Sequence, residues 1–284
     1  MESVEFRPHA GFPDDWQELK PKGVIRMNRT ALITGASGGI GRELARIFAR
    51  EGWDLVVVAR SEQRLMLLKQ ELETPHGVSV HVLVQDMAEA DAAQRISQRL
   101  AQEAIPVDAL VNNAGFGDNG DFVDADWARQ RDMVQLNVLA LMQMTHVFGA
   151  QMRARGSGRI LNIASVAAFF AGPGMSVYYA SKAFVRSFSE AVAAELRGTG
   201  VTVTALCLGP AKTGFEANAH MKGSRMFKLL FPENPRTVAE AGYRAMMTGR
   251  TLCYHGVVTK LGAIGERILP RALSRRMTRF VNGR

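Results

Sequence analysis

Two side chains on one predicted helix have the chemistry for proton transfer. Tyr178 and Lys182 are four positions apart in the helical pattern 177–198, so both lie on one face, one turn from each other. A free tyrosine has a pKa of about 10 and exchanges protons poorly at neutral pH, but a nearby lysine ammonium stabilises the phenolate and lowers that pKa. A half-buried aromatic beside a surface lysine gives the same spacing. Tyr179 is three positions from Lys182 and is expected to point to a different side.

Ser165 adds a hydroxyl to this group. It follows the predicted strand 159–164, thirteen residues before Tyr178. At that place it fits either a hydrogen bond to a substrate carbonyl oxygen or the cap of a turn. No histidine or acid has the spacing of a Ser–His–Asp hydrolase, and His146, in a long helical pattern, fits a packed or solvated position better than a catalytic one.

A glycine-rich turn predicts a nucleotide site. The apolar strand pattern 30–34 leads into Thr34-Gly35-Ala36-Ser37-Gly38-Gly39-Ile40-Gly41, which opens a helical pattern at 41–51. Unpaired N–H groups at a helix start and the helix dipole favour a pyrophosphate, and glycine allows the backbone to approach it closely. An ordinary structural turn also uses glycine, so the placement between strand and helix carries the prediction.

The end of the second predicted strand indicates which dinucleotide binds. An enzyme that selects NAD usually has an acidic residue there for the ribose 2′-hydroxyl. This chain has Val58-Ala59-Arg60 instead, and Arg60, with help from Arg64 or Arg42, suits a 2′-phosphate. We therefore expect NADP(H) to be favoured over NAD(H). Arg60 also fits a plain surface position at the start of the next helix.

Two further strand ends carry polar residues. After the third strand, Asp86 in Gln85-Asp86-Met87 fits either the adenine amino group or the cap of the following helix. After the fourth, the small-residue turn Asn112-Asn113-Ala114-Gly115 would let a cofactor ribose lie close, although an ordinary Asn–Gly turn reads the same way.

The elements that position these residues alternate between strand and helix. Most strands are continuous apolar runs, which is typical of parallel strands buried on both faces. The chain therefore predicts a single-domain, doubly wound α/β parallel sheet of about seven strands with helices on both faces. The expected strands are 30–34, 55–59, 78–84, 109–112, 159–164, 201–208 and 253–258, and the expected helices are 41–51, 61–73, 88–104, 126–154, 177–198 and 236–248.

Three segments are expected along the chain. Residues 1–28 form an irregular N-terminal extension, and Met27 could be the natural start. Residues 29–260 form the main domain with a substrate loop at about 211–235, and residues 261–284 form a basic amphipathic tail.

The joint set of motifs resembles the short-chain dehydrogenase/reductase family, in the branch with a Thr-Gly-x-x-x-Gly-x-Gly turn and a Tyr-x-x-x-Lys helix. The resemblance covers about residues 29–260 and includes the family's Rossmann fold. The motifs that carry it are the glycine turn 34–41, Asn112-Asn113-Ala114-Gly115, Asn137 in the long helix, Ser165 with Tyr178 and Lys182, and Leu208-Gly209-Pro210-Ala211-Lys212-Thr213. In the last motif, Leu208 replaces the first proline of the family's Pro-Gly-Pro-x-x-Thr.

This resemblance implies an NADP(H)-dependent carbonyl reductase or alcohol dehydrogenase without a metal. Tyr178 would be the general acid in reduction and the base in oxidation, while Lys182 would hold the nicotinamide ribose and depress the Tyr178 pKa. Ser165 would orient the carbonyl, and Asn137 would support a water relay to Lys182 through its backbone. The residues implied at the cofactor are Gly35, Ser37, Gly39, Ile40, Gly41, Arg60, Asp86, Met87, Asn113, Ala114, Gly115, Tyr178, Lys182, Pro210 and Thr213.

Composition narrows the setting of this chemistry. The 284 residues carry a net charge of +8, but Lys and Arg are spread along the chain, which favours a solvated surface and an anionic cofactor over nucleic acid. Cys207 and Cys253 lie in apolar runs and are expected in the core rather than in a disulfide. No apolar run is long enough for a membrane span and the N-terminus lacks a signal-like apolar segment, so a cytoplasmic protein is expected.

The substrate is expected to be apolar. Large apolar residues before Tyr178 and after Thr213 suggest either an adaptable pocket lid or a lid packed on its own domain. They are Phe169, Phe170, Met175, Phe215, Met221, Met226, Phe227, Leu229, Leu230 and Phe231. A lipid-like, steroid-like or aromatic ketone fits such a pocket, and so does a 3-oxoacyl chain. A regulator that binds a dinucleotide without chemistry is the alternative, but it has no need of Ser165, Tyr178 and Lys182 together.

The tail from Gly262 to Arg284 mixes apolar residues with arginines and is broken by Pro270. A basic amphipathic helix can lie on an anionic membrane surface, although such helices more often pack on the subunit or a partner. Members of the family with similar tails use them to close the pocket or an oligomer interface, and the resemblance implies a homodimer or homotetramer.

Overall fold

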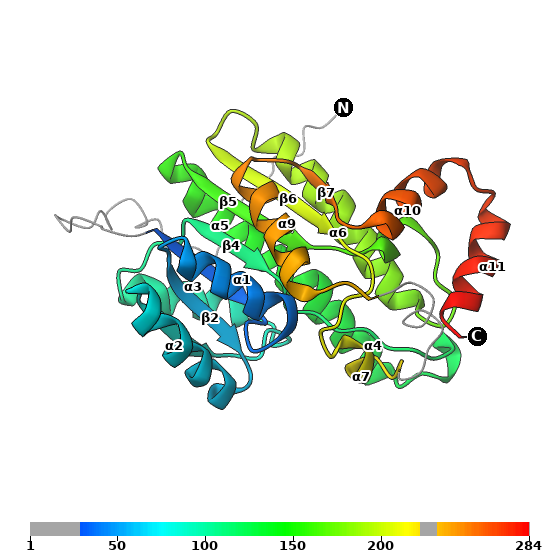
Figure 1. The fold of residues 1–284 in the computed structure, drawn as a ribbon, viewed down its shortest axis with the longest axis horizontal. Coiled ribbons are helices and arrows are strands. Elements are labelled where there is room, and N and C mark those ends of the chain that lie inside the picture. Colours follow the sequence, from blue (N-terminus) through cyan, green and yellow to red (C-terminus); the bar gives the residue numbers. More distant parts are fainter. Residues whose placement is uncertain (1–28, 222–231, 284) are drawn as a thin grey trace, which may run out of the picture.

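Seven parallel strands form one sheet in the computed structural model, which describes residues 29–221 and 232–283 (Figure 1). Their order is β3-β2-β1-β4-β5-β6-β7, and each pair of neighbours is parallel. The doubly wound α/β sheet expected from the sequence is thereby confirmed. The strands are β1 (Thr30–Thr34), β2 (Asp54–Ala59), β3 (Val80–Val84), β4 (Ala109–Asn112), β5 (Gly158–Ile163), β6 (Val201–Cys207) and β7 (Leu252–Tyr254).

Helices cover both faces of this sheet because alternate residues of each central strand point to opposite sides. In β1, Ala31 and Ile33 are buried in the core formed with α1 (Gly39–Arg50), α2 (Glu62–His76) and α9 (Pro235–Met247). Leu32, between them, belongs to the core on the other face. That core includes residues of α3 (Ala92–Gln102), α5 (Leu141–Arg155) and α6 (Ser176–Glu195). Figure 1 shows α1 and α9 lying together in front of the strands.

The strand order reverses between β1 and β4, and this switch point is where open α/β sheets bind ligands. The glycine turn follows β1 and leads into α1, whereas Asn113 and Gly115 follow β4. The two motifs therefore lie next to each other at the carboxyl edge of the sheet, although they are far apart in the sequence.

The helix expected at 126–154 is present, but it is not α-helical throughout. It consists of α4 (Trp127–Val134), a π-helical segment (Gln135–Ala140) and α5. No glycine or proline lies at this break, so the apolar period alone gives no sign of it. Asn137 lies inside the π-helical segment, and such segments are frequent at functional sites.

The chain after β6 differs most from expectation. The strand expected at 253–258 ends at Tyr254, because Gly256 takes a φ of +80° and α10 (Val257–Ile268) begins directly after it. The two β-branched residues Val257 and Val258 fit a strand as well as a helix, which misled the prediction. The tail helix thus starts four residues before position 261, and Pro270 separates it from α11 (Arg271–Val281).

Short segments complete the fold: the 3₁₀ turns Phe122–Asp124 and Val166–Phe169, and α7 (Phe215–Asn218). The expected extension 1–28 and the loop residues 222–231, with Met226, Phe227, Leu229, Leu230 and Phe231, lie outside the described residues. Over the described ranges, the helices are too short or too polar to cross a bilayer. Cys207 and Cys253 are buried and unpaired, as expected.

Two glycines before β6 differ in how closely another part of the backbone approaches them. Gly198 and Gly200 both have φ near +80°, but a Cβ on Gly200 would lie 1.9 Å from the Gly156 carbonyl oxygen, whereas Gly198 faces open space. We expect Gly200→Ala to lower the free energy of unfolding by about 3 kcal/mol or more, and Gly198→Ala by about 1 kcal/mol. Urea unfolding of the two variants measures the difference, and equal losses would contradict the described approach of the two backbones.

Candidate active site

Hydrogen bonds join the ends of β1 and β4 at the switch point. The Thr34 hydroxyl accepts from the backbone N–H groups of Asn113 (3.0 Å) and Ala114 (3.1 Å) and donates to the Val111 carbonyl (3.3 Å). In return, the Asn113 side-chain amide donates to the carbonyls of Thr34 (2.9 Å) and Gly35 (3.2 Å). The glycine turn is therefore held against the Asn113 turn by side chains from both.

The glycines are needed because there is no room for side chains in this turn. A Cβ on Gly41 would lie 2.4 Å from the Gly35 carbonyl oxygen, and one on Gly39 would lie 2.9 Å from the Thr213 Cβ. Helix α1 begins at Gly39, and its N-cap residue Gly38 supplies no side-chain cap. Free N–H groups at this helix start, with Ser37 beside them, fit a pyrophosphate. Ile40 is buried, so only its backbone can contribute.

The end of β2 presents one exposed cation. Arg60 is 81% exposed, and its Nη1 lies 3.9 Å from the Asp86 Oδ2. Arg42, the other expected helper, is instead held by Glu71 on α2 at 2.7 Å. Arg64 remains exposed on the first turn of α2.

Asp86 does not cap α3, which begins only at Ala92. Its Oδ1 accepts from the backbone N–H of Ala88 (3.0 Å), so that it stabilises its own turn. Met87 beside it is buried. The other carboxylate oxygen of Asp86 faces Arg60, at the edge where an adenine amino group is expected.

Asn112 is the last residue of β4, directly before the Asn113-Ala114-Gly115 turn, and it belongs to a buried polar network rather than to an open site. Its side-chain amide donates to Asn162 (2.9 Å) on β5 and to the Thr145 hydroxyl (3.1 Å) on α5. The Asn162 amide then donates to Ser189 (2.9 Å) on α6. Because each of these buried donors has a partner, the network joins β4, β5 and α6 beneath the site.

Ser165, Tyr178 and Lys182 form one cluster. Ser165 precedes a 3₁₀ turn and accepts from the Ala167 N–H (3.1 Å), and its hydroxyl also hydrogen-bonds the Tyr178 hydroxyl. Of the two uses considered for Ser165, the cap of a turn is therefore observed, and the bond to a substrate carbonyl stays a prediction. Lys182 lies one turn along α6, with its Nζ 5.8 Å from the Tyr178 ring centroid and donating to the Ile163 carbonyl at 2.8 Å.

Burial dominates the electrostatics of this cluster. It raises the pKa of Tyr178 to about 12, and the Ser165 hydrogen bond only partly opposes this rise. Burial also lowers the pKa of Lys182 to about 8. Lys182 is not among the groups that shift the Tyr178 pKa here, since its ammonium donates to the Ile163 carbonyl, and the expectation that it depresses this pKa stays a prediction. At neutral pH, Tyr178 keeps its proton.

Asn137 positions the chain that leads from β4 into the site. Its Oδ1 accepts from the Phe116 N–H (3.1 Å), while its amide donates to the Phe116 carbonyl (2.9 Å) and to the Ser181 hydroxyl (3.2 Å). Ser181 in turn donates to the Tyr178 carbonyl (2.7 Å). Gly115 lies directly beside this link, since a Cβ there would be 2.9 Å from Asn137 Oδ1 and 3.6 Å from Lys182 Nζ.

Several residues of this arrangement were missed by sequence reasoning. Ser181 has no motif of its own, and only its place between Tyr178 and Lys182 could have drawn attention to it. Tyr179 points away from Lys182, as expected, but its hydroxyl donates to Asn282 at 3.1 Å, a residue 103 positions later. Asn282 also donates to the Pro173 carbonyl (3.0 Å), and the end of α11 is thereby attached beside Tyr178. No local pattern indicates such a contact.

Apolar side chains cover Tyr178. The Phe215 ring lies 5.2 Å from the Tyr178 ring, and a Cβ on Gly117 would meet Phe215, Met175 and Tyr178 within 3.3 Å. Met221 is buried in the same cluster. The described part of the lid is thus packed on its own domain. Phe169 differs from this group, since its ring packs in the core against Tyr254.

An ion cluster holds this lid to the segment after β4. Asp118 accepts from Arg129 (2.8 Å) and Gln130 (2.8 Å) and lies 2.8 Å from His220 Nδ1. Burial opposes ionisation of Asp118, but its bonds to Arg129 and His220 lower its pKa below the usual value. Asp118, Arg129 and His220 border a groove of about 370 Å³. Its lining also includes Asp121, Asp124 and Asp126.

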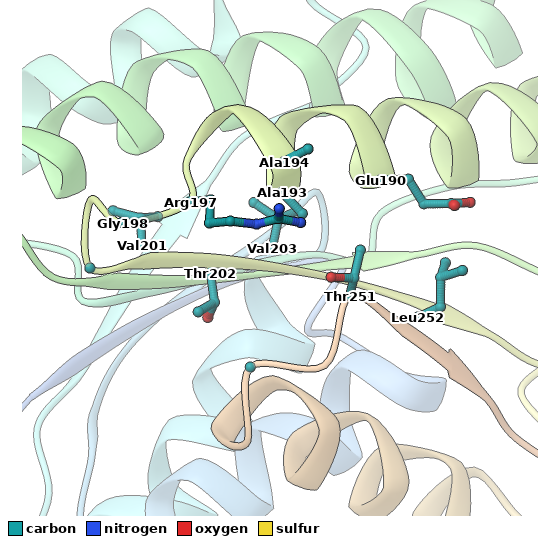
Figure 2. Close-up of a pocket in the computed structure, with 12 residues that line it drawn as sticks. Glu190, Ala193, Ala194, Arg197, Gly198, Val201, Thr202, Val203, Thr251 and Leu252 are labelled. Atoms are coloured by element: carbon teal, nitrogen blue, oxygen red, sulfur yellow. The ribbon is translucent and has the colours of Figure 1, made fainter.

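A second groove, of about 550 Å³, lies elsewhere. Figure 2 shows that Glu190 and Arg197 of the α6 end and Thr202 and Thr251 of the strand starts border it. Because β6 and β7 begin there, this groove lies at the amino edge of the sheet, opposite to Tyr178. It is separate from the candidate active site.

The pKa of Lys182 predicts a pH-dependent stability. In the unfolded chain Lys182 is charged up to its usual pKa of 10.5, but in the fold burial lowers the pKa to about 8. The buried ammonium therefore costs stability below pH 8, by about 3 kcal/mol, and this cost fades as the pH rises to 10.5. We expect the free energy of unfolding of Lys182→Met, relative to the wild type, to be highest at neutral pH and to fall by this amount towards pH 10.5. A pH-independent difference in urea unfolding would contradict the assigned burial.

Comparison with known proteins agrees with this geometry. A family model described as short chain dehydrogenase matches residues 29–222. Sulfoacetaldehyde reductase 2 of Chromohalobacter salexigens is 39% identical over 191 residues, which is 66% of this chain and 75% of that protein. Ketoacyl reductase HetN of Nostoc sp. is 32% identical over 224 residues, which is 78% of this chain and 77% of that protein.

A solved structure gives the same result. The short-chain dehydrogenase from Sphingobium yanoikuyae in complex with NADPH has a TM-score of 0.75 and 31% identity, with coverage of 84% of this chain and 93% of that one. The chain therefore belongs to the short-chain dehydrogenase/reductase family and is an oxidoreductase that interconverts a carbonyl and an alcohol.

Proposed function

We propose that Tyr178 is the acid/base of a carbonyl reductase whose dinucleotide binds across the switch point. The observation that carries this assignment is the hydrogen bond between Ser165 and Tyr178, with Lys182 one turn away, at the same sheet edge as the glycine turn. A dinucleotide-binding regulator has no need of such a cluster. The bound nicotinamide supplies or accepts the hydride.

In reduction, Tyr178 gives its hydroxyl proton to the substrate carbonyl oxygen as that oxygen becomes negative. Because the pKa of Tyr178 is raised to about 12, the proton is present at neutral pH. Ser165 donates a hydrogen bond to the same oxygen and stabilises its developing charge. Lys182 stabilises the phenolate left on Tyr178 by its positive charge, and Asn137 holds the Phe116 backbone and the Ser181 hydroxyl in place.

The dinucleotide is held by backbone more than by side chains. Gly35, Gly39 and Gly41 let the neighbouring protein atoms pack closely around the turn, and the start of α1 supplies N–H donors for the pyrophosphate. Asn113, Ala114 and Gly115 form the floor below the ribose. Pro210 and Thr213 follow β6, and the Thr213 Cβ lies against the Gly39 position, at the nicotinamide end.

The proposed cofactor is NADP(H) rather than NAD(H). Arg60 is the exposed guanidinium at the β2 end, where a 2′-phosphate is expected, and it has only a distant partner in Asp86. Arg64 on the next helix turn can add a second charge. The glutamate that holds Arg42 removes that residue from the proposed phosphate site.

The proposed substrate is an apolar ketone, with a 3-oxoacyl chain as the alternative. Tyr178 packs in an apolar cluster that includes Met175, Phe215 and Met221.

We further propose that the chain is a homodimer or homotetramer. Val123 and Trp127, before and on α4, and Leu139 in the π-helical segment are large apolar residues that remain exposed. Together they form a surface of the kind that subunit contacts cover.

Replacing Tyr178 tests the catalytic assignment. Tyr178→Phe removes the proton but keeps the ring, so kcat should fall by about 10²–10⁴-fold while NADPH affinity stays nearly unchanged. Tyr243→Phe is the matched control, because Tyr243 lies on α9 and packs against Phe48 of α1, away from the candidate site. This variant should keep its kcat. NADPH oxidation with an aromatic ketone panel measures the rates, and fluorescence titration measures binding. A Tyr178→Phe variant that keeps the wild-type rate would overturn the assignment.

Replacing Arg60 tests the cofactor preference. Arg60→Ala should weaken NADPH binding about 10–100-fold because it removes a charge-assisted bond to the 2′-phosphate, and should leave NADH binding nearly unaffected. Arg50→Ala, an exposed arginine at the far end of α1, serves as the charge control. Titration with both cofactors gives the two dissociation constants, and equal losses for NADPH and NADH would refute the preference.

A further inference from the structure

Helix α10 is packed with its small residues inward and its large residues outward. Its buried positions are Thr259, Gly262 and Gly265. A Cβ on Gly262 would lie within 3.4 Å of Val166, Phe169 and Phe170, so the helix lies directly on the turn after Ser165.

The opposite face of α10 carries four large aliphatic side chains at spacings of four, three and four. They are between 56% and 73% exposed, and they form one continuous stripe: Val257, Leu261, Ile264 and Ile268. Helix α11 also exposes large apolar side chains, Leu273 and Met277. An ordinary surface helix buries its large apolar residues against the core, whereas α10 and α11 expose theirs to solvent. Exposed apolar surfaces of this kind mark sites of interaction.

Basic side chains flank the exposed stripes. Lys260, Arg267 and Arg276 each directly precede a stripe residue and therefore lie about 100° around the helix from it. Residues 257–283 contain six basic residues and one acidic residue. That acid, Glu266, is already paired with Arg186 at 2.6 and 2.8 Å. The face is consequently apolar in its centre and cationic at its edge.

The two helices are fixed to the domain. The Arg186–Glu266 pair holds α10, and the Thr278 hydroxyl of α11 donates to the Ala171 carbonyl at 2.8 Å. Asn282 bonds Tyr179 and Pro173, as described above. Figure 1 shows α10 and α11 at one end of the molecule, beyond β7. The face is thus preformed and needs no folding to bind.

We propose that α10 and α11 form a docking surface for an anionic lipid membrane. The aliphatic stripe enters the boundary between headgroups and acyl chains, while Lys260, Arg267 and Arg276 reach the lipid phosphates. A second copy of the chain fits this face less well, because a symmetric contact would bring two cationic edges together. The protein would lie on one leaflet, with the turn after Ser165 directly behind the docked helix.

Co-sedimentation with vesicles tests this proposal. The full chain should bind vesicles of equal parts phosphatidylglycerol and phosphatidylcholine, fail to bind phosphatidylcholine alone, and be released by high salt. Leu261→Ser with Ile268→Ser should weaken binding at least about tenfold, and so should Lys260→Gln with Arg267→Gln.

Matched controls separate the surface from general effects. Met66→Ser with Leu67→Ser removes exposed apolar residues from α2, and Arg153→Gln removes an exposed charge from α5, and both variants should bind like the wild type. Thermal melting confirms that each variant is folded. Equal binding to neutral and anionic vesicles, or no binding to either, would overturn the proposal. So would a sedimentation velocity result in which the α10 variants dissociate an oligomer, because the face would then be a subunit contact.

Discussion

The hydrogen bonds between Thr34 and Asn113 are the constraint on which the rest of the site depends. They fix the glycine turn of β1 against the turn of β4, and three of the five groups that take part belong to the backbone. The close approach leaves no room for a Cβ at Gly35 or Gly41. Because the same β4 turn continues through Gly115 to Phe116, which Asn137 holds, the dinucleotide cradle and the proton-transfer cluster share one rigid strand end.

Burial sets the protonation of the cluster more than its charges do. It disfavours the ionised forms of both Tyr178 and Lys182, so the pKa of Tyr178 rises and the pKa of Lys182 falls. Only the Ser165 hydroxyl opposes this for Tyr178. The low-dielectric site that shifts these pKa values makes Tyr178 a weaker acid, but it also strengthens each hydrogen bond to a developing oxyanion, which works in the opposite direction.

Sequence reasoning succeeded where the signal is local. The limits of β1 and β4 agree to the residue with the prediction, because strands buried on both faces are nearly continuous apolar runs. Spacing on α6 placed Tyr178 and Lys182 on one face. Local patterns could not show the π-helical turn around Asn137, which depends on packing, or the bond from Tyr179 to Asn282, which joins residues 103 positions apart. They also could not give the direction of the Tyr178 pKa, since burial is a property of the whole fold.

The attachment of α11 has a consequence for local opening. Within this helix only Thr278 is buried, so polar contacts rather than apolar burial hold it in place. An element of this kind detaches at a free energy well below that of global unfolding. When it does, Tyr179 and the carbonyls of Ala171 and Pro173 lose their partners in the same event. The turn beside Tyr178 and α11 therefore form one cooperative unit, and protection of that turn against hydrogen exchange is set by the stability of a helix outside the sheet.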